Sequence, residues 1–117
     1  ERLEAWLLTV EEGYGAEGNS FTGPLHAADV VARFASIAGK TRGRYAFASD
    51  RSLLAGLLAA IVHDYGHSGK SNAYHVALGD YIARQFNDQQ VLENLSLQKA
   101  FDLMSTPRLD FMHKSKI

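Results

Sequence analysis

The chain has 117 residues, enough for about one domain with its own hydrophobic core. Its formal net charge of -1, with 46% hydrophobic and 21% charged residues, excludes a general electrostatic attraction to nucleic acid or to anionic membranes. Cysteine is absent, which excludes disulfides and thiolate metal sites, so any metal must be held by His, Asp or Glu.

The N-terminal sequence, ERLEAWLL, lacks the basic start and the cleavage pattern of a signal peptide. No apolar run approaches the roughly 20 residues that a membrane helix needs. We therefore expect a soluble protein of the cytoplasm, without a membrane span. The first residue is Glu1 rather than Met, so we expect a piece of a longer product.

The first half of the chain predicts two helices separated by an irregular loop. Apolar residues at helical spacing predict an amphipathic helix over 2–13, with Gly13 as its stop. Glycines, Asn and Ser then predict a loop as far as Pro24, which suits a first helical turn. A mostly buried helix should follow over 24–38, and the basic, glycine-containing stretch 39–49 should be a solvated connection.

The third predicted helix is the most apolar segment of the chain. Asp50 is a candidate N-cap, and the residues up to Val62 are apolar on all sides. A helix of this kind belongs in a core. Ser71 or Asn72 could cap a further helix that runs through about Phe86.

The C-terminal part predicts one more helix and a tail. Asn87 and Asp88 interrupt the apolar pattern, a helix follows to about Met104, and Pro107 closes it. The mixed residues 108–117 should be frayed or packed on a partner. Since the sequence shows no strand pattern and no internal repeat, we predict an all-α fold, a compact multi-helix bundle.

The stretch LAAIVHDYGHSG, from Leu58 to Gly69, ends an apolar helix in three polar side chains: His63, Asp64 and His67. If the helix continued, the two imidazoles would share a face. Burying such groups without partners costs a few kcal/mol. The pattern therefore predicts either a divalent-cation site or a hydrogen-bonded cluster in the core.

Three stretches in order extend this motif: NSFTGPLHAADV from Asn19, IVHDYGHSGKSNAY from Ile61, and FNDQQVLEN from Phe86. Together they resemble the catalytic domain of the class I cyclic nucleotide phosphodiesterases, which are HD-type metal phosphohydrolases. The resemblance implies the helical phosphodiesterase fold, with 1–117 as the N-terminal to middle part of its single catalytic domain. It also implies metal-dependent hydrolysis of cyclic AMP or cyclic GMP to 5'-monophosphates in cyclic nucleotide signalling.

The resemblance further implies a set of metal ligands. His26, His63 and Asp64 match metal-binding positions, and Asp64 matches the ligand that bridges two cations. Imidazoles with a carboxylate suit Zn²⁺, and an oxygen-rich neighbouring site suits Mg²⁺ or Mn²⁺. Asp29 is expected to orient a ligand histidine through its second ring nitrogen.

Other matched positions imply catalytic and substrate roles. His67 matches a histidine that contacts metal-bound solvent and the phosphate region, and Glu93 matches an acid that supports that solvent. Phe21 is the candidate aromatic for substrate contact, as part of the site wall. The histidines outside the motifs, His75 and His113, are expected to be packing or surface residues.

Departures from the family pattern leave a second interpretation open. Thr22 replaces the histidine that protonates the leaving oxygen, a loss that commonly costs about 100-fold to 10,000-fold in rate. The family's last metal-binding aspartate and its purine-reading glutamine have no match here. The alternative is a catalytically impaired or truncated module that binds metal, nucleotide or a protein partner.

A third interpretation is a different histidine-aspartate metal phosphohydrolase. In each case, cutting a larger helical domain at this point should expose the apolar faces of the helices after Asp50. Such faces favour self-association, so we expect a homo-oligomer or contact with the rest of a longer chain. Asn72 is expected to cap or brace the turn after Gly69.

Overall fold

The computed structural model describes residues 1–16, 22–41 and 49–113, and within these ranges all regular structure is helical. This confirms the predicted all-α class. The helices are α1 (Arg2–Ala16), α2 (Pro24–Thr41), α3 (Asp50–Val62), α4 (Asn72–Leu78), α5 (Tyr81–Gln85) and α6 (Val91–Leu103). Among the described helices, none combines the length and the apolar character needed to cross a membrane.

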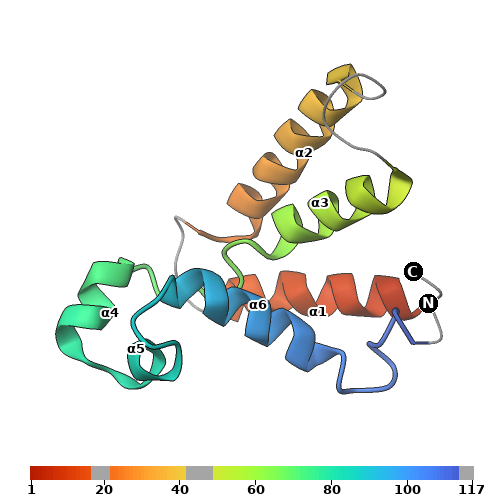
Figure 1. The fold of residues 1–117 in the computed structure, drawn as a ribbon. Coiled ribbons are helices and arrows are strands. Elements are labelled where there is room, and N and C mark those ends of the chain that lie inside the picture. Colours follow the sequence, from red (N-terminus) through yellow and green to blue (C-terminus); the bar gives the residue numbers. More distant parts are fainter. Residues whose placement is uncertain (17–21, 42–48, 114–117) are drawn as a thin grey trace.

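The helices do not form a bundle with one common axis (Figure 1). Helices α1 and α6 form a base, and α2 and α3 form an arm. In the base, α6 lies against α1, and the Trp6 indole N–H donates to the carbonyl of Ala100 at 3.3 Å. Helices α2 and α3 pack on each other and diverge from the base, while α4 and α5 lie at one end of it. The radius of gyration is 15.5 Å, above the roughly 13 Å of a compact domain of this length, so the arrangement is more open than predicted.

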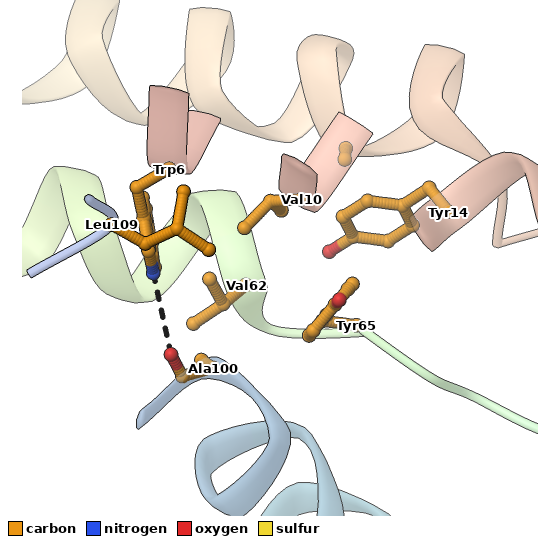
Figure 2. Close-up of a cluster of buried hydrophobic side chains, with 8 residues drawn as sticks. Trp6, Val10, Tyr14, Val62, Tyr65, Ala100 and Leu109 are labelled. Carbon is orange, nitrogen blue, oxygen red and sulfur yellow. Dashed lines mark hydrogen bonds between the residues drawn. The ribbon is translucent and has the colours of Figure 1, made fainter. Parts of the chain in front are cut away.

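The buried core joins α1 to the end of α3, to α6 and to the C-terminal segment (Figure 2). Trp6, Val10 and Tyr14 supply the stripe of α1, and Val62 and Leu109 pack against it. Leu109 is 3% exposed, and the ring of Phe111 meets the edge of Trp6 at a centroid distance of 5.1 Å. The segment after Pro107 is therefore part of the core as far as Phe111, which corrects the prediction of a frayed tail.

Helix α1 does not stop at Gly13, as predicted, but continues to Ala16. A Cβ at Gly13 would overlap the ring of Tyr65, so the glycine permits close packing against the turn after α3. Because the helix continues, Tyr14 stays in register with Trp6 and Val10 and enters the core.

The prediction that α2 and α3 are mostly buried is wrong for the described structure. In α3 only Ala60 and Val62 are buried, and in α2 only Ala27 and Ala38. The two helices pack chiefly on each other, and their other apolar side chains are half-buried or, like Leu25, Ile37 and Leu54, exposed. This exposure agrees with the expected apolar faces, while self-association stays a prediction.

Helix starts follow side-chain caps at the residues that the structure selects. Ser49, not Asp50, is the N-cap of α3, since its hydroxyl accepts from the N–H of Ser52 at 3.2 Å. Ser71 caps α4 as predicted, accepting from the N–H of Tyr74 at 3.1 Å. Both serines occupy the extended conformation that an N-cap residue adopts.

The predicted single helix through Phe86 is divided into α4 and α5. Gly79 ends α4 in the left-handed region at φ 61°, a conformation that glycine adopts without strain. Asp80 then caps α5, and its carboxylate accepts from the N–H of Ala83 at 3.1 Å. The last helix begins at Val91 rather than near Asp88, because Asn87, Asp88 and Gln90 all have positive φ.

His75 is 6% exposed and is a packing residue, as predicted. Its hydrogen bonds stabilise the break between α4 and α5. Its Nδ1 lies 2.6 Å from Asp80 Oδ2, and its Nε2 lies 2.7 Å from the hydroxyl of Ser68. The carboxylate accepts from Nδ1–H, so in neutral imidazole Nε2 is the acceptor for Ser68. The histidine thus connects the loop before α4 to the start of α5.

We expect Asp80→Asn to lower the Tm by a few degrees at pH 7. Asparagine keeps the cap but loses the charge next to His75. The hydrogen bond from His75 is the largest cause that lowers the pKa of Asp80 below its usual 3.8. A carboxyl group whose pKa is lower in the folded than in the unfolded protein stabilises the fold at pH values above its unfolded-state pKa. This stabilisation is lost as the pH falls through the folded-state pKa.

Thermal unfolding at several pH values measures this effect. The difference in Tm between wild type and Asp80→Asn should be full at pH 7 and should shrink below about pH 4. Asp102→Asn, which changes an exposed aspartate of α6, is the matched control and should leave the Tm unchanged. A pH-independent difference would contradict the expected role of the charge.

Candidate metal centre

Three of the predicted ligands come together where α2 begins and α3 ends. His26 lies in the first turn of α2, His63 caps the C-terminus of α3, and Asp64 follows it. Asp64 Oδ2 lies 3.0 Å from His63 Nε2 and 3.3 Å from His26 Nε2. The two histidine Nε2 atoms are 3.4 Å apart. One ligand atom from each residue therefore falls within 4.8 Å of the others.

The orientation of His63 is set by its own helix. Its Nδ1 lies 2.7 Å from the carbonyl of Ala60, and a carbonyl can only accept, so Nδ1 carries a hydrogen. In neutral His63 the lone pair is then on Nε2, which faces the carboxylate of Asp64 at 3.0 Å. Two facing lone pairs need a positive species between them. A proton or a metal cation can fill that place.

The spacing fits a divalent cation. Ligand bonds of 2.0–2.2 Å in tetrahedral geometry place neighbouring N and O ligands about 3.3 Å apart. The observed separations between the three residues run from 3.0 to 3.4 Å. A histidine that donates its second ring nitrogen to a backbone carbonyl is also the usual support of a metal ligand.

The surroundings of the three residues also favour a cation. Asp64 places a carboxylate just beyond the C-terminus of α3, where the helix dipole is negative and disfavours an anion. The side chains remain partly open to solvent, with 36% exposure for His26, 33% for His63 and 20% for Asp64. Partial exposure leaves room for a further ligand, which catalytic metal sites need.

His67 and Glu93 have other partners in the described structure. Helix α3 ends at Val62, so His67 does not share a helical face with His63. Its Nδ1 accepts from the N–H of Gly69 at 2.9 Å, and Nε2 therefore carries the hydrogen of a neutral ring. Glu93 Oε2 accepts from the amide of Asn72 at 2.9 Å. Their catalytic roles stay predictions.

Asn72 is a bridge rather than a helix cap. Besides its bond to Glu93, its Oδ1 accepts from the backbone N–H of Leu92 at 2.9 Å. The side chain therefore connects the start of α4 to the first turn of α6. This agrees with the predicted bracing role, but the brace spans two helices instead of the turn after Gly69.

Four further residues were singled out in the sequence: Phe21, Thr22, Asp29 and His113. Phe21 lies outside the described residues. Thr22 is 7% exposed and stands in the turn before α2. Asp29 is exposed and pairs with Arg33 at 2.9 Å, so its role in orienting a histidine stays a prediction. His113 is exposed and lies 3.6 Å from Asp110, as expected of a surface residue.

Tyr14 is the residue near the centre that sequence reasoning missed. Its hydroxyl donates to the carbonyl of Ile61 at 2.7 Å and accepts from the N–H of Asp64 at 3.3 Å. Burial is the largest cause that raises the pKa of Tyr14 to about 12, so the hydroxyl keeps its proton. The signal in the sequence was the spacing of four residues from Trp6 to Val10 and from Val10 to Tyr14.

An all-helical fold with two histidines and an aspartate converging at a helix junction defines a protein with a candidate divalent-cation centre. The profile of the family described as 3'5'-cyclic nucleotide phosphodiesterase matches residues 23–116 of the chain. The chain therefore belongs to this family, whose members are metal-dependent, and the resemblance seen in the motifs is confirmed.

Curated relatives support the same family. A dual specificity calcium/calmodulin-dependent 3',5'-cyclic nucleotide phosphodiesterase 1 of Drosophila melanogaster is 40% identical over 102 residues, 87% of this chain and 12% of the relative. A dual specificity calcium/calmodulin-dependent 3',5'-cyclic nucleotide phosphodiesterase 1B of Homo sapiens is 34% identical over 108 residues, 92% of this chain and 20% of the relative. A 3',5'-cyclic-AMP phosphodiesterase 4 of Dictyostelium discoideum is 32% identical over 93% of this chain and 10% of the relative. The chain thus spans between a tenth and a fifth of the length of these relatives.

Proposed function

We propose that this chain forms the metal-binding portion of an enzyme that hydrolyses 3',5'-cyclic nucleotides, cyclic AMP or cyclic GMP, to 5'-monophosphates. The observation that carries the proposal is the convergence of His26, His63 and Asp64 with separations that suit a divalent cation. The printed names of the relatives support the substrate class.

His26 and His63 would hold Zn²⁺ through their Nε2 atoms, with Asp64 as the carboxylate ligand shared with a neighbouring Mg²⁺ or Mn²⁺. A bound divalent cation supplies neutralisation of the phosphate charge and an activated water. The partial exposure of the three side chains leaves the cation accessible to substrate.

His67 and Glu93 are proposed to act on solvent and phosphate next to the cations. With Nδ1 engaged by Gly69, His67 presents Nε2–H as a donor that can contact a phosphate oxygen. The carboxylate of Glu93 is oriented by Asn72, which also bonds the backbone of α6. Phe21 is proposed to contact the substrate as part of the site wall.

Thr22 supports a second candidate function, a non-catalytic module that binds metal, nucleotide or a protein partner. A threonine hydroxyl does not act as a general acid near neutral pH, and Thr22 is buried, with 7% exposure. Under this reading the chain keeps the cation site and lacks turnover. The exposed apolar side chains of α2 and α3 would then suit a protein partner or a second copy.

One experiment separates the two functions. Zn²⁺ is titrated into the purified chain by calorimetry, and hydrolysis of cyclic AMP and cyclic GMP is assayed with Zn²⁺ and Mg²⁺ present. Turnover by the wild type would establish the enzyme, and bound Zn²⁺ without turnover would favour the non-catalytic module. In that case Thr22→His alone should not create activity, and appreciable turnover of this variant would count against the module.

A further inference from the structure

The side chain of Tyr14 joins α1 to the turn that carries His63 and Asp64 by two hydrogen bonds. The hydroxyl of Tyr14 bonds the carbonyl of Ile61 at 2.7 Å and the N–H of Asp64 at 3.3 Å. These two backbone groups flank His63 in the sequence. One hydroxyl therefore bonds the backbone before His63, at Ile61, and after it, at Asp64, which is the carboxylate ligand.

Both backbone groups need a partner from outside their helix. The carbonyl of Ile61 is among the last four of α3, which have no N–H of the same helix to accept. The N–H of Asp64 lies two residues beyond the end of α3. A hydroxyl can donate once and accept at the same time, so Tyr14 satisfies both with one group.

The side chain of Tyr14 is held in place by the hydrophobic core. The residue is 4% exposed, and its ring lies 5.8 Å from the ring of Tyr65 (Figure 2). It continues the buried stripe of Trp6 and Val10 on α1, so the hydroxyl is carried by the core of the protein. Motion of the turn relative to α1 would break two partly buried hydrogen bonds.

We infer that Tyr14 is a positioning residue for the metal centre, whose hydroxyl sets the direction in which the carboxylate of Asp64 meets the histidine ligands. The side chain of His63 is oriented by Ala60, so the backbone at Asp64 is the part that Tyr14 controls. This inference rests on the proposed cation site. It concerns how the ligands are held and does not depend on turnover.

The test compares Tyr14→Phe with wild type and with Thr9→Val. Phenylalanine keeps the ring and removes only the hydroxyl. Thr9 lies on the same helix and donates to the carbonyl of Ala5 at 2.8 Å, so Thr9→Val is a matched loss of a hydroxyl away from the turn. Co²⁺ is the probe, because its visible absorption reports both binding and ligand geometry.

We expect Tyr14→Phe to weaken Co²⁺ binding by about 10-fold to 100-fold, the usual cost of removing support from a metal ligand, and to alter the absorption spectrum. Thr9→Val should stay within about 2-fold of wild type, since its hydroxyl bonds the carbonyl of Ala5 within α1. Binding by Tyr14→Phe within about 2-fold of wild type, with an unchanged spectrum, would overturn the inference.

Amide hydrogen exchange without metal provides a measurement that is independent of the cation. In wild type the N–H of Asp64 should be protected, and in Tyr14→Phe the amides of residues 63–65 should exchange at least about 10-fold faster, without a change in α4. Fast exchange of Asp64 in wild type would overturn the inference even if Tyr14→Phe failed to fold. If wild type bound no Co²⁺, the proposed cation site would fail, and exchange would still decide whether Tyr14 holds the turn.

Discussion

Replacing Asp64 by asparagine should weaken divalent-cation binding by more than about 100-fold, because the loss of a supporting partner alone costs 10-fold to 100-fold and this change removes a charged ligand. The amide would keep the size of the side chain but not the negative charge that faces both histidines at 3.0 and 3.3 Å. Calorimetric titration with Zn²⁺ measures the effect directly. Any hydrolysis of cyclic AMP or cyclic GMP should fall with it.

Asp102→Asn is the matched control for this prediction. Asp102 is an exposed aspartate near the end of α6, and no role at the candidate metal centre is assigned to it. The control removes the same charge from another part of the chain. If Asp102→Asn weakened Zn²⁺ binding as strongly as Asp64→Asn, net charge rather than ligation would explain the effect, and Asp64 would lose its assigned role.

Trp6→Ala should lower the free energy of unfolding by about 3–5 kcal/mol, the usual cost of deleting a buried aromatic side chain. Trp6 is 2% exposed, contacts Phe111 edge to face, and donates to the carbonyl of Ala100. Its removal would leave a cavity where α1, α6 and the C-terminal segment meet (Figure 2). Since domains of this size are stable by only about 5–15 kcal/mol, a large part of the stability would be lost.

Urea unfolding followed by far-UV circular dichroism measures this change, because Trp6 is the only tryptophan and the variant loses its fluorescence. Leu8→Ala, at a position of α1 that is 53% exposed, is the control and should cost less than about 1 kcal/mol. Trp6→Phe keeps much of the packing and should lie between the two. A loss below about 1 kcal/mol in Trp6→Ala would show that this contact does not hold the base together.

Apolar spacing and capping residues predicted where helices lie, but not every helix boundary. The start of α4 at Ser71 follows from a serine hydroxyl that bonds an N–H three residues later. The break between α4 and α5 was missed because Gly79 and Asp80 lie inside a continuous apolar pattern. His75, which stabilises that break, bonds Asp80 and Ser68 through polar atoms, and apolar spacing carries no signal for such polar contacts.

Burial was predicted less well than helicity. The sequence of α3 is apolar on all sides, yet only Ala60 and Val62 are buried, because only the C-terminal part of α3 joins the core with α1 and α6, while the helix packs chiefly on α2. Conversely, Leu109 is buried although its segment has no apolar period. Burial depends on which elements meet, and apolar periodicity states only which side chains could be covered.

The residues of the candidate metal centre were found in the sequence, but their arrangement was not. Motif spacing singled out His63, Asp64 and His67, and the resemblance to a family that the profile confirms added His26 and assigned His26, His63 and Asp64 as candidate ligands. Adjacent residues such as His63 and Asp64 are close in any fold. His26, 37 positions before His63, reaches them only because α2 packs on α3 at the junction where one begins and the other ends.

By itself the sequence determined the class of fold, the family and the identity of the three candidate ligands, because helix periodicity and short motifs are properties of neighbouring residues. The tertiary structure decided which helix faces are covered, how His26 reaches His63 and Asp64, and how Tyr14 on α1 is bonded to the turn after α3. These features join residues far apart in the chain, and their geometry is fixed only when the helices pack.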